Sequence, residues 1–104
     1  MTMLLQFVFK PLPGSELGAI VTTAKEAARL WKKHGATEAS LWTVAVGEMG
    51  SMAFNVHFED FAGYGNCYDS LLKDADFRKW QMDVVKQGMT EWVRGSVARK
   101  MSLD

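Results

Sequence analysis

The chain has 104 residues, of which 48% are hydrophobic and 23% are charged. This length suits one domain with a substantial core, and the composition excludes an intrinsically disordered protein. Basic and acidic residues balance at 12 each, so no net charge favours nucleic acid or an anionic membrane as a partner. We therefore expect a single globular domain over residues 1–104.

Cysteine usage and the N-terminal residues indicate a compartment. Cys67 is the one cysteine of the chain, so no internal disulfide can form, which favours a reducing, cytoplasmic environment. The first apolar run, MTMLLQFVFK, has no basic leader and is followed by Pro11 and Pro13. We expect a strand there, not a signal peptide or a membrane span.

Residue periodicity predicts the elements of the first half of the chain. Alternation predicts a strand over residues 3–10, ended by the two prolines. An apolar stripe of helical spacing predicts a helix from about Ser15 to His34, closed by Gly35. A second strand is expected over Glu38 to Val46.

The second half begins with a tight turn at residues 47–50 and a third strand over residues 52–58. Asp60 is suited to cap a second helix, which extends to Leu72, because its carboxylate can accept backbone N–H bonds. A short third helix follows the acidic break at residues 74–76 and ends at Gly88. Residues 90–101 form the fourth strand.

The predicted order is β-α-β-β-α(α)-β, which gives a ferredoxin-like α+β fold. In that fold a four-stranded antiparallel sheet carries the helices on one face. If Glu48 and Met49 are the two turn residues, Trp42 lies opposite Asn55 and Ser40 lies opposite His57, all on the face without helices. A loop one residue longer would reverse the faces.

The sheet face without helices is expected to be too apolar for a monomer. It would carry the side chains of Trp42, Val44, Trp92 and Val8. Burial against a second copy about a two-fold axis is the simplest remedy. We therefore predict a homodimer.

Candidate functional residues gather on the same predicted face. His57, Asn55 and Arg94 are the candidate catalytic groups, since histidine transfers protons near neutral pH and arginine can hold a carboxylate or enolate oxygen. The candidate ligand-binding residues are Trp42, Gln6, Trp92 and Ser96, with Tyr64 and Tyr68 on the second helix. The alternative is a hydrogen-bonded polar patch at a dimer interface, with both tyrosines packed in the core.

Residues 55–80, NVHFEDFAGYGNCYDSLLKDADFRKW, resemble the dimeric α+β barrel superfamily, and especially its NIPSNAP-like and antibiotic-biosynthesis-monooxygenase-like branches. The shared pattern is a strand that leads into an acidic residue, an aromatic-bearing helix, and then Asp76-Phe77 with Trp80. The resemblance implies that two sheets pair into a barrel. NIPSNAP-like members commonly carry a histidine three residues before the glutamate, whereas His57 lies two before Glu59, so no role for it is implied.

The same resemblance bears on cofactors. The superfamily includes cofactor-free monooxygenases, haem-degrading enzymes, isomerases and decarboxylases, together with many proteins without a known activity. The haem-degrading branch uses an asparagine on its first strand, where this chain has Gln6. The two histidines are 23 positions apart and no CxxC spacing exists, so neither haem nor a metal is expected.

Two functions fit the sequence. The first is binding or transformation of a small apolar or aromatic metabolite, as by a cofactor-independent oxygenase or isomerase, in a pocket between sheet and helices or in the barrel lumen. The second is a non-catalytic dimerisation or interaction module whose barrel is filled by Trp42 and Trp92. The size of the barrel lumen distinguishes the two functions, because a ligand needs free space there and a filled barrel leaves none.

Overall fold

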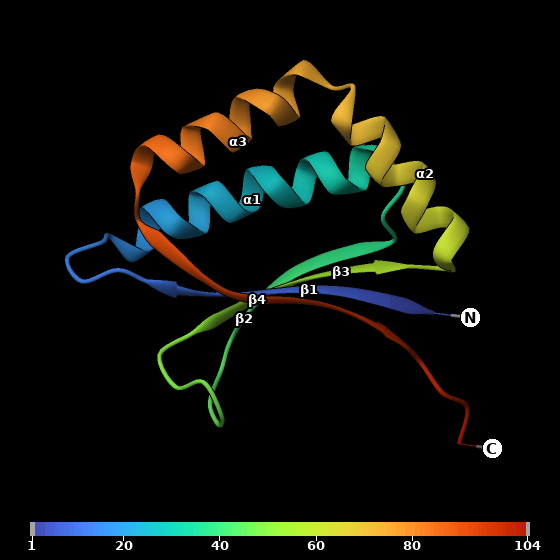
Figure 1. Ribbon diagram of the computed structural model, residues 1–104, viewed down its shortest axis with the longest axis horizontal. Helices are drawn as coiled ribbons and strands as arrows, with labels where there is room; N and C mark the ends of the chain where they lie inside the picture. Colours follow the sequence, from blue (N-terminus) through green and yellow to red (C-terminus); the bar gives the residue numbers. More distant parts are fainter. Residues whose placement is uncertain (1, 104) are drawn as a thin grey trace.

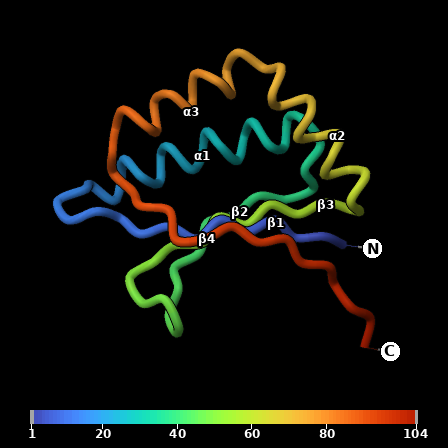
Figure 2. Tube along the Cα trace, in the orientation of Figure 1, coloured from blue at the N-terminus to red at the C-terminus, as the bar shows by residue number. Residues whose placement is uncertain are grey.

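The computed structural model describes residues 2–103. Its elements are β1 (Met3–Pro11), α1 (Leu17–Lys33), β2 (Glu38–Thr43), β3 (Met52–Phe58), α2 (Phe61–Leu72), α3 (Ala75–Gln87) and β4 (Thr90–Arg99). The strands form one antiparallel sheet in the order β2-β3-β1-β4. The helices lie together on one side of that sheet (Figure 1, Figure 2). The predicted ferredoxin-like α+β fold is confirmed.

The hydrophobic core lies between the helices and the sheet. Alternate residues of β1 and β3 face the helices, and Val56 and Phe58 are 0% and 1% exposed. The apolar stripe of α1 delivers Leu30, also fully buried, and a buried leucine or phenylalanine contributes about 1.5–3 kcal/mol. Cys67 of α2 is buried as expected, and desolvation raises the pKa of its thiol.

Aspartates begin the two shorter helices. Asp60 caps α2, because its Oδ1 accepts a hydrogen bond of 2.7 Å from the amide of Gly63. Asp74 caps α3, where its Oδ1 accepts one of 2.8 Å from the amide of Asp76. Gly88 ends α3 in the left-handed conformation, at φ 57°. The Asp60 cap and the end of α3 at Gly88 match the sequence prediction, which left the cap of α3 open within the acidic break at residues 74–76.

The first helix begins later than predicted. Its first residue is Leu17, and the capping residue Glu16 makes no side-chain cap hydrogen bond. The hydroxyl of Ser15 donates instead to the backbone oxygen of Met89, at 2.9 Å. Ser15 therefore ties the β1–α1 connection to the start of β4 and does not cap α1.

The hairpin between β2 and β3 is looser than predicted. β2 ends at Thr43, not at Val46, and Ser40 pairs with Asn55 while Trp42 pairs with Ala53. The predicted register is thus wrong by two residues, which leaves every side chain on its predicted face because the pleat has a period of two. The cause is a wide loop over residues 44–51 in place of the tight turn.

A β-bulge in β4 overturns a second prediction. Trp92 pairs with Phe9 and Arg94 pairs with Val8, so Val93 is an extra residue in the ladder. A bulge shifts the alternation by one position. Trp92 therefore lies on the helix side of the sheet, and the prediction that it shares a face with Arg94 is wrong.

The face without helices is less apolar than predicted. Val8 and Ala53 lie on it but are only 1% and 5% exposed, and neither belongs to the core cluster on the helix side. The loop over residues 44–51 turns toward this face (Figure 1), and Arg94 Nε donates to Glu48 Oε1 of that loop at 3.0 Å. Trp42 stays 58% exposed.

Replacing Asp60 with alanine removes the acceptor that caps α2. We expect the free energy of unfolding, measured by urea titration, to fall by about 1 kcal/mol. Asp69→Ala is the control, because Asp69 is an exposed aspartate of the same helix whose carboxylate makes no hydrogen bond within residues 2–103. Its effect should stay within about 0.5 kcal/mol, and equal losses in the two variants would contradict the capping role.

Candidate functional site

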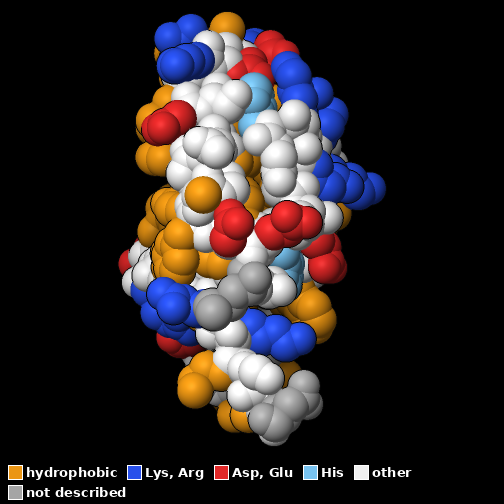
Figure 3. Space-filling view, turned by 90° about the vertical axis from the view of Figure 1, so that its right-hand side faces the viewer, with side chains coloured by type: hydrophobic (Ala, Val, Ile, Leu, Met, Phe, Trp, Pro, Cys, Tyr) orange, Lys and Arg blue, Asp and Glu red, His pale blue; other side chains and the backbone are white. Residues whose placement is uncertain are grey.

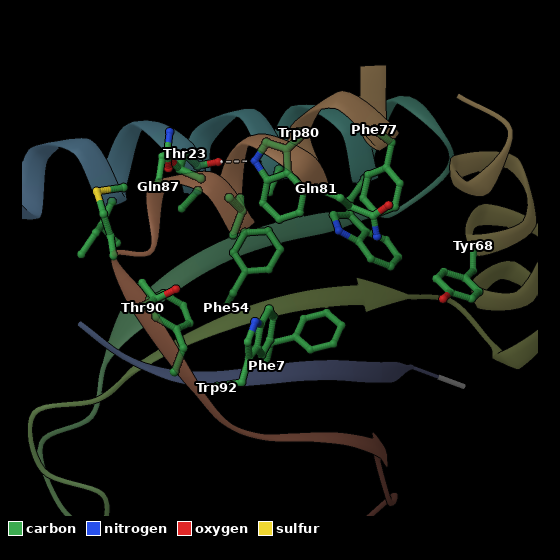
Figure 4. Close-up of a pocket in the computed structure, with 17 residues that line it drawn as sticks. Phe7, Thr23, Phe54, Tyr68, Phe77, Trp80, Gln81, Gln87, Thr90 and Trp92 are labelled. Carbon is green, nitrogen blue, oxygen red and sulfur yellow. Dashed lines mark hydrogen bonds between the residues drawn. The ribbon is translucent and has the colours of Figure 1, made fainter. Parts of the chain in front are cut away.

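A cavity of about 290 Å³ lies between the helices and the sheet. α1, α2, α3 and the strands β1, β3 and β4 all contribute to its lining (Figure 4). Eight of the 17 lining residues are aromatic. They are Phe7, Phe9, Trp31, Phe54, Tyr68, Phe77, Trp80 and Trp92. The excess of aromatic residues in this short chain is therefore concentrated around one space.

Contacts among these rings hold the walls of the cavity in place. Trp31 is packed edge-to-face on Phe77, with ring centroids 6.2 Å apart, and is tilted against Phe7 at 6.4 Å. Phe77 stacks on Trp80 at 5.8 Å. Aromatic pairs of this kind contribute beyond their buried area, so the rings are positioned before a ligand arrives.

The polar groups of the lining are few and uncharged. The indole N–H of Trp80 donates to the backbone oxygen of Thr23 at 3.0 Å, and the Thr23 hydroxyl donates to Gln87 Oε1 at 3.3 Å. The side chains of Gln81 and Thr90 make no hydrogen bond to another residue of the described chain. These two are free to bind water or the polar edge of a ligand.

The lining contains no acidic, basic or histidine side chain within residues 2–103. An isolated charge is costly to move from water into such a space. The phenol of Tyr68 adds a hydroxyl group to the lining. The cavity is therefore suited to neutral molecules.

The cavity opens toward β4. The residues of β4 after Thr90 are all exposed, because the helices cover β1 and β3 but do not extend over this edge strand. Trp92 is 57% exposed and stands on the sheet side of the opening, whereas Gln81 and Gln87 come from α3 on the helix side (Figure 4). The polar side chains of the lining thus lie near the mouth.

The predicted catalytic residues lie on the opposite face of the sheet from this cavity. Gln6 pairs with Asn55 on one side and with Ser96 on the other. Gln6 Nε2 donates to Asn55 Oδ1 at 2.9 Å, and Arg94 Nη1 donates to Gln6 Oε1 at 3.4 Å. The structure therefore brings Asn55, Gln6, Ser96 and Arg94 together, as the sequence predicted.

Arg94 and Trp42 already have partners on that face. The hydrogen bond between Arg94 and Glu48 raises the pKa of the guanidinium and lowers that of the carboxyl. The indole N–H of Trp42 donates to Ser40 Oγ at 2.7 Å. The hydrogen-bonded polar patch described as an alternative thus exists, although its place in a dimer interface stays a prediction.

His57 stands apart from this patch. It lies opposite Glu38 on β2 and Leu4 on β1, and its imidazole accepts or donates no hydrogen bond within the described residues. A histidine that acts as an acid or base is normally oriented by a partner of its second ring nitrogen. The structure therefore does not join His57 to Asn55 and Arg94.

The two predicted tyrosines stack on each other, with ring centroids 6.1 Å apart, but only Tyr68 belongs to the lining of the cavity. Tyr68 lines the cavity and stacks on Trp31, with centroids 6.4 Å apart and an interplanar angle of 12°. Tyr64 packs edge-to-face on Phe58 at 5.5 Å and is not part of the lining. Sequence reasoning missed Trp31 as a wall of the cavity, because a buried aromatic stripe looks the same beside a filled core and beside a cavity.

A further polar cluster joins the helix ends. His34 Nε2 donates to Asp74 Oδ2 at 2.6 Å, and His34 Nδ1 lies 2.9 Å from Ser70 Oγ. Bonds from His34, from the Asp76 amide and from Lys33 hold the pKa of Asp74 well below its usual range. None of these side chains lines the cavity, so the cluster ties the end of α1 to the α2–α3 junction. In the space-filling view, acidic, basic and histidine side chains lie next to one another at one end of the face shown (Figure 3).

Among residues 2–103, no three His, Cys, Asp or Glu side chains gather in a way that could hold a metal ion. Within the same range, no helix has the length and apolarity needed to cross a membrane.

Neither a family model nor a curated protein sequence matches this chain, but solved structures do. A NIPSNAP-family protein of unknown function from Agrobacterium tumefaciens is 10% identical, with 99% of this chain and 91% of that one covered and a TM-score of 0.74. A NIPSNAP domain protein from Burkholderia xenovorans is 13% identical, with 100% and 98% covered and a TM-score of 0.71. The chain shares the fold of these two NIPSNAP proteins.

A third match extends the comparison. A protein of unknown function from Bacteroides thetaiotaomicron, called a possible oxidoreductase, is 13% identical, with 93% of this chain and 95% of that one covered and a TM-score of 0.64. At such identities the likeness concerns the fold alone. The NIPSNAP-like resemblance inferred from residues 55–80 is confirmed at that level, and no activity follows from it.

The Asp74 cluster predicts an acid-sensitive fold. A lowered folded-state pKa means that the stabilising contribution is fully present above the ordinary aspartate pKa of about 3.9 and is lost as the pH falls through the folded value. We expect Asp74→Asn to lose less unfolding free energy than the wild type between pH 5 and pH 2, measured by urea titration. Asp69→Asn is the control and should follow the wild type. If the free energy of unfolding falls with pH in Asp74→Asn as steeply as in the wild type, the role of this carboxylate is refuted.

Proposed function

We propose that this protein binds a small, neutral, apolar or aromatic molecule in the cavity between its helices and its sheet. One observation carries the proposal: eight aromatic side chains surround a space of about 290 Å³ whose lining, within residues 2–103, has no charged member. Ligand pockets usually measure roughly 300–1,000 Å³. A space at the lower end of that range suits a molecule of one or two rings.

Binding is favoured over acid–base catalysis by the same lining. A cofactor-independent oxygenase or isomerase needs a group that moves a proton. Within residues 2–103 the lining has no carboxylate, amine or imidazole for that task, and the phenol of Tyr68 is the one group of this kind. The candidate catalytic residues His57, Asn55 and Arg94 are separated from the cavity by the sheet itself. A role for them belongs to the other face, where a ligand would be enclosed only if a second copy covered it.

The binding proposal predicts a preference for neutral ligands. In isothermal titration calorimetry at pH 7, 2-naphthol should bind at least roughly tenfold more tightly than 2-naphthoate, because the cavity offers no partner for a carboxylate. Ala24→Leu places three additional carbons in the cavity and should weaken naphthol binding by roughly tenfold or more.

Ala62→Leu makes the same change at an exposed position of α2 and serves as the control. It should bind naphthol as the wild type does. Equal affinity for the two probes, or equal affinity in the two leucine variants, would rule out this cavity as the site.

We further propose that the protein is a homodimer through the sheet face without helices. Support comes from the side chains that remain exposed on β2 and its loop, where Trp42, Val46 and Met49 are 58%, 88% and 72% exposed. The strand β4 also leaves a ten-residue edge unpaired, and such edges usually pair or are covered. A second copy would bury both features.

A lysine in place of Trp42 tests the homodimer. The side chain is mostly exposed, so Trp42→Lys should leave the fold intact while it places a charge in the proposed interface. Sedimentation velocity should give a dimer for the wild type and a monomer, or a dimer weakened by at least roughly tenfold, for the variant. Val85→Lys, on the outer side of α3 and 80% exposed, is the matched control and should remain dimeric. A monomeric wild type would refute the proposal.

A further inference from the structure

The β-bulge in β4 decides what stands on the sheet side of the cavity mouth. Val93 is the extra residue, since Trp92 pairs with Phe9 and Arg94 pairs with Val8. Under regular alternation Trp92 would face away from the helices, beside Arg94. The bulge turns the indole to the cavity side instead.

Two phenylalanines of β1 hold the Trp92 indole. Its ring centroid lies 5.3 Å from that of Phe7, with an interplanar angle of 84°, and 6.4 Å from that of Phe9, with an angle of 61°. Both contacts are edge-to-face, which is a favoured arrangement of aromatic pairs. The indole nevertheless stays 57% exposed. Part of its surface is therefore held in position without being covered by protein.

The helix side of the mouth presents a different chemistry. Figure 4 shows Trp92 and Thr90 on the sheet side, with Trp80, Gln81 and Gln87 on the helix side. A molecule that enters between them meets an aromatic ring on one side and amide groups on the other. Its ring packs on the indole, and its polar edge reaches the amides or the Thr90 hydroxyl.

We propose that Trp92 is the specificity-determining residue of this site and that it selects planar aromatic ligands over saturated ligands with the same skeleton. This inference rests on the ligand-binding function proposed above. A planar ring can pack face or edge against a tryptophan, and such a pair adds roughly twofold to tenfold in affinity beyond the buried area. A puckered saturated ring gains from its buried area alone.

Calorimetry with 2-naphthol and decahydro-2-naphthol tests the selection, because the two share a carbon skeleton and a hydroxyl group. The wild type should bind 2-naphthol roughly threefold to tenfold more tightly. Trp92→Leu should reduce this preference by at least roughly twofold, and Trp92→Phe should retain it because it keeps an aromatic ring. Phe61→Leu is the control, since Phe61 is a 46% exposed aromatic residue outside the lining, and it should show the wild-type preference.

The outcomes distinguish this inference from the proposed function. If Trp92→Leu weakens both probes equally and keeps the preference, Trp92 only supports the fold, and its selective role is overturned while ligand binding stands. If the wild type binds both probes equally, the inference is overturned without reference to any variant, so it does not depend on how well Trp92→Leu folds. If the wild type binds neither probe, the proposed function fails and this inference fails with it.

Discussion

The pairing of β1 with both of its neighbours governs the rest of this structure. β1 lies between β3 and β4, and its pleat sends Phe7 and Phe9 toward the helices and Gln6 and Val8 away from them. Because paired residues share a face, the neighbouring strands inherit this division. The result is an aromatic cavity on one side of the sheet and a hydrogen-bonded polar patch on the other.

This division gives the two faces separate chemical roles. The cavity side can exclude water and bury rings, but it has no group of fixed charge to polarise a bound molecule. The other side has an arginine and an amide pair, yet Arg94 is engaged with Glu48 and Asn55 with Gln6. The imidazole of His57 is unengaged but lies on the face without the cavity, and among residues 2–103 the phenol of Tyr68 is the one acid or base in the lining. For that reason the geometry supports recognition of a ligand more strongly than its conversion.

Most of the fold could be read from the sequence, because its signals are local. Asp60 and Gly88 mark helix ends through their own side-chain and backbone chemistry, and the structure uses both as predicted. The errors arose where pairing depends on a neighbouring strand. Residues 42–46 alternate like a strand although the strand ends at Thr43. Nothing in the letters Trp92-Val93-Arg94 shows that one of them is left out of the ladder.

The candidate site, too, could be predicted only in part from the sequence. Local alternation correctly placed Gln6, Asn55 and Ser96 on one face, and the pairing of β1 with β3 and β4 brings them together. The two-residue error in the β2–β3 register does not change which face a residue of β2 lies on. The sequence left open whether a pocket lies between sheet and helices or in the barrel lumen, since the helical spacing of Trp31, Phe77 and Trp80 fits a filled core equally well. Only the relative positions of three helices and a sheet decide whether large side chains meet or leave a space between them.

The pairing of β1 with β4 also joins the two ends of the polypeptide. Met3 pairs with Arg99, and the amide of Lys100 donates to the backbone oxygen of Thr2 at 2.8 Å. During synthesis β1 leaves the ribosome before β4, so the edge of β1 that pairs with β4 stays unpaired until β4 has emerged. The sheet therefore closes only after β4 has been synthesised, and long-range pairing of this kind slows folding. Until then the backbone N–H and C=O groups along one edge of β1 have no strand to pair with, and an unpaired edge of this kind can pair with other chains.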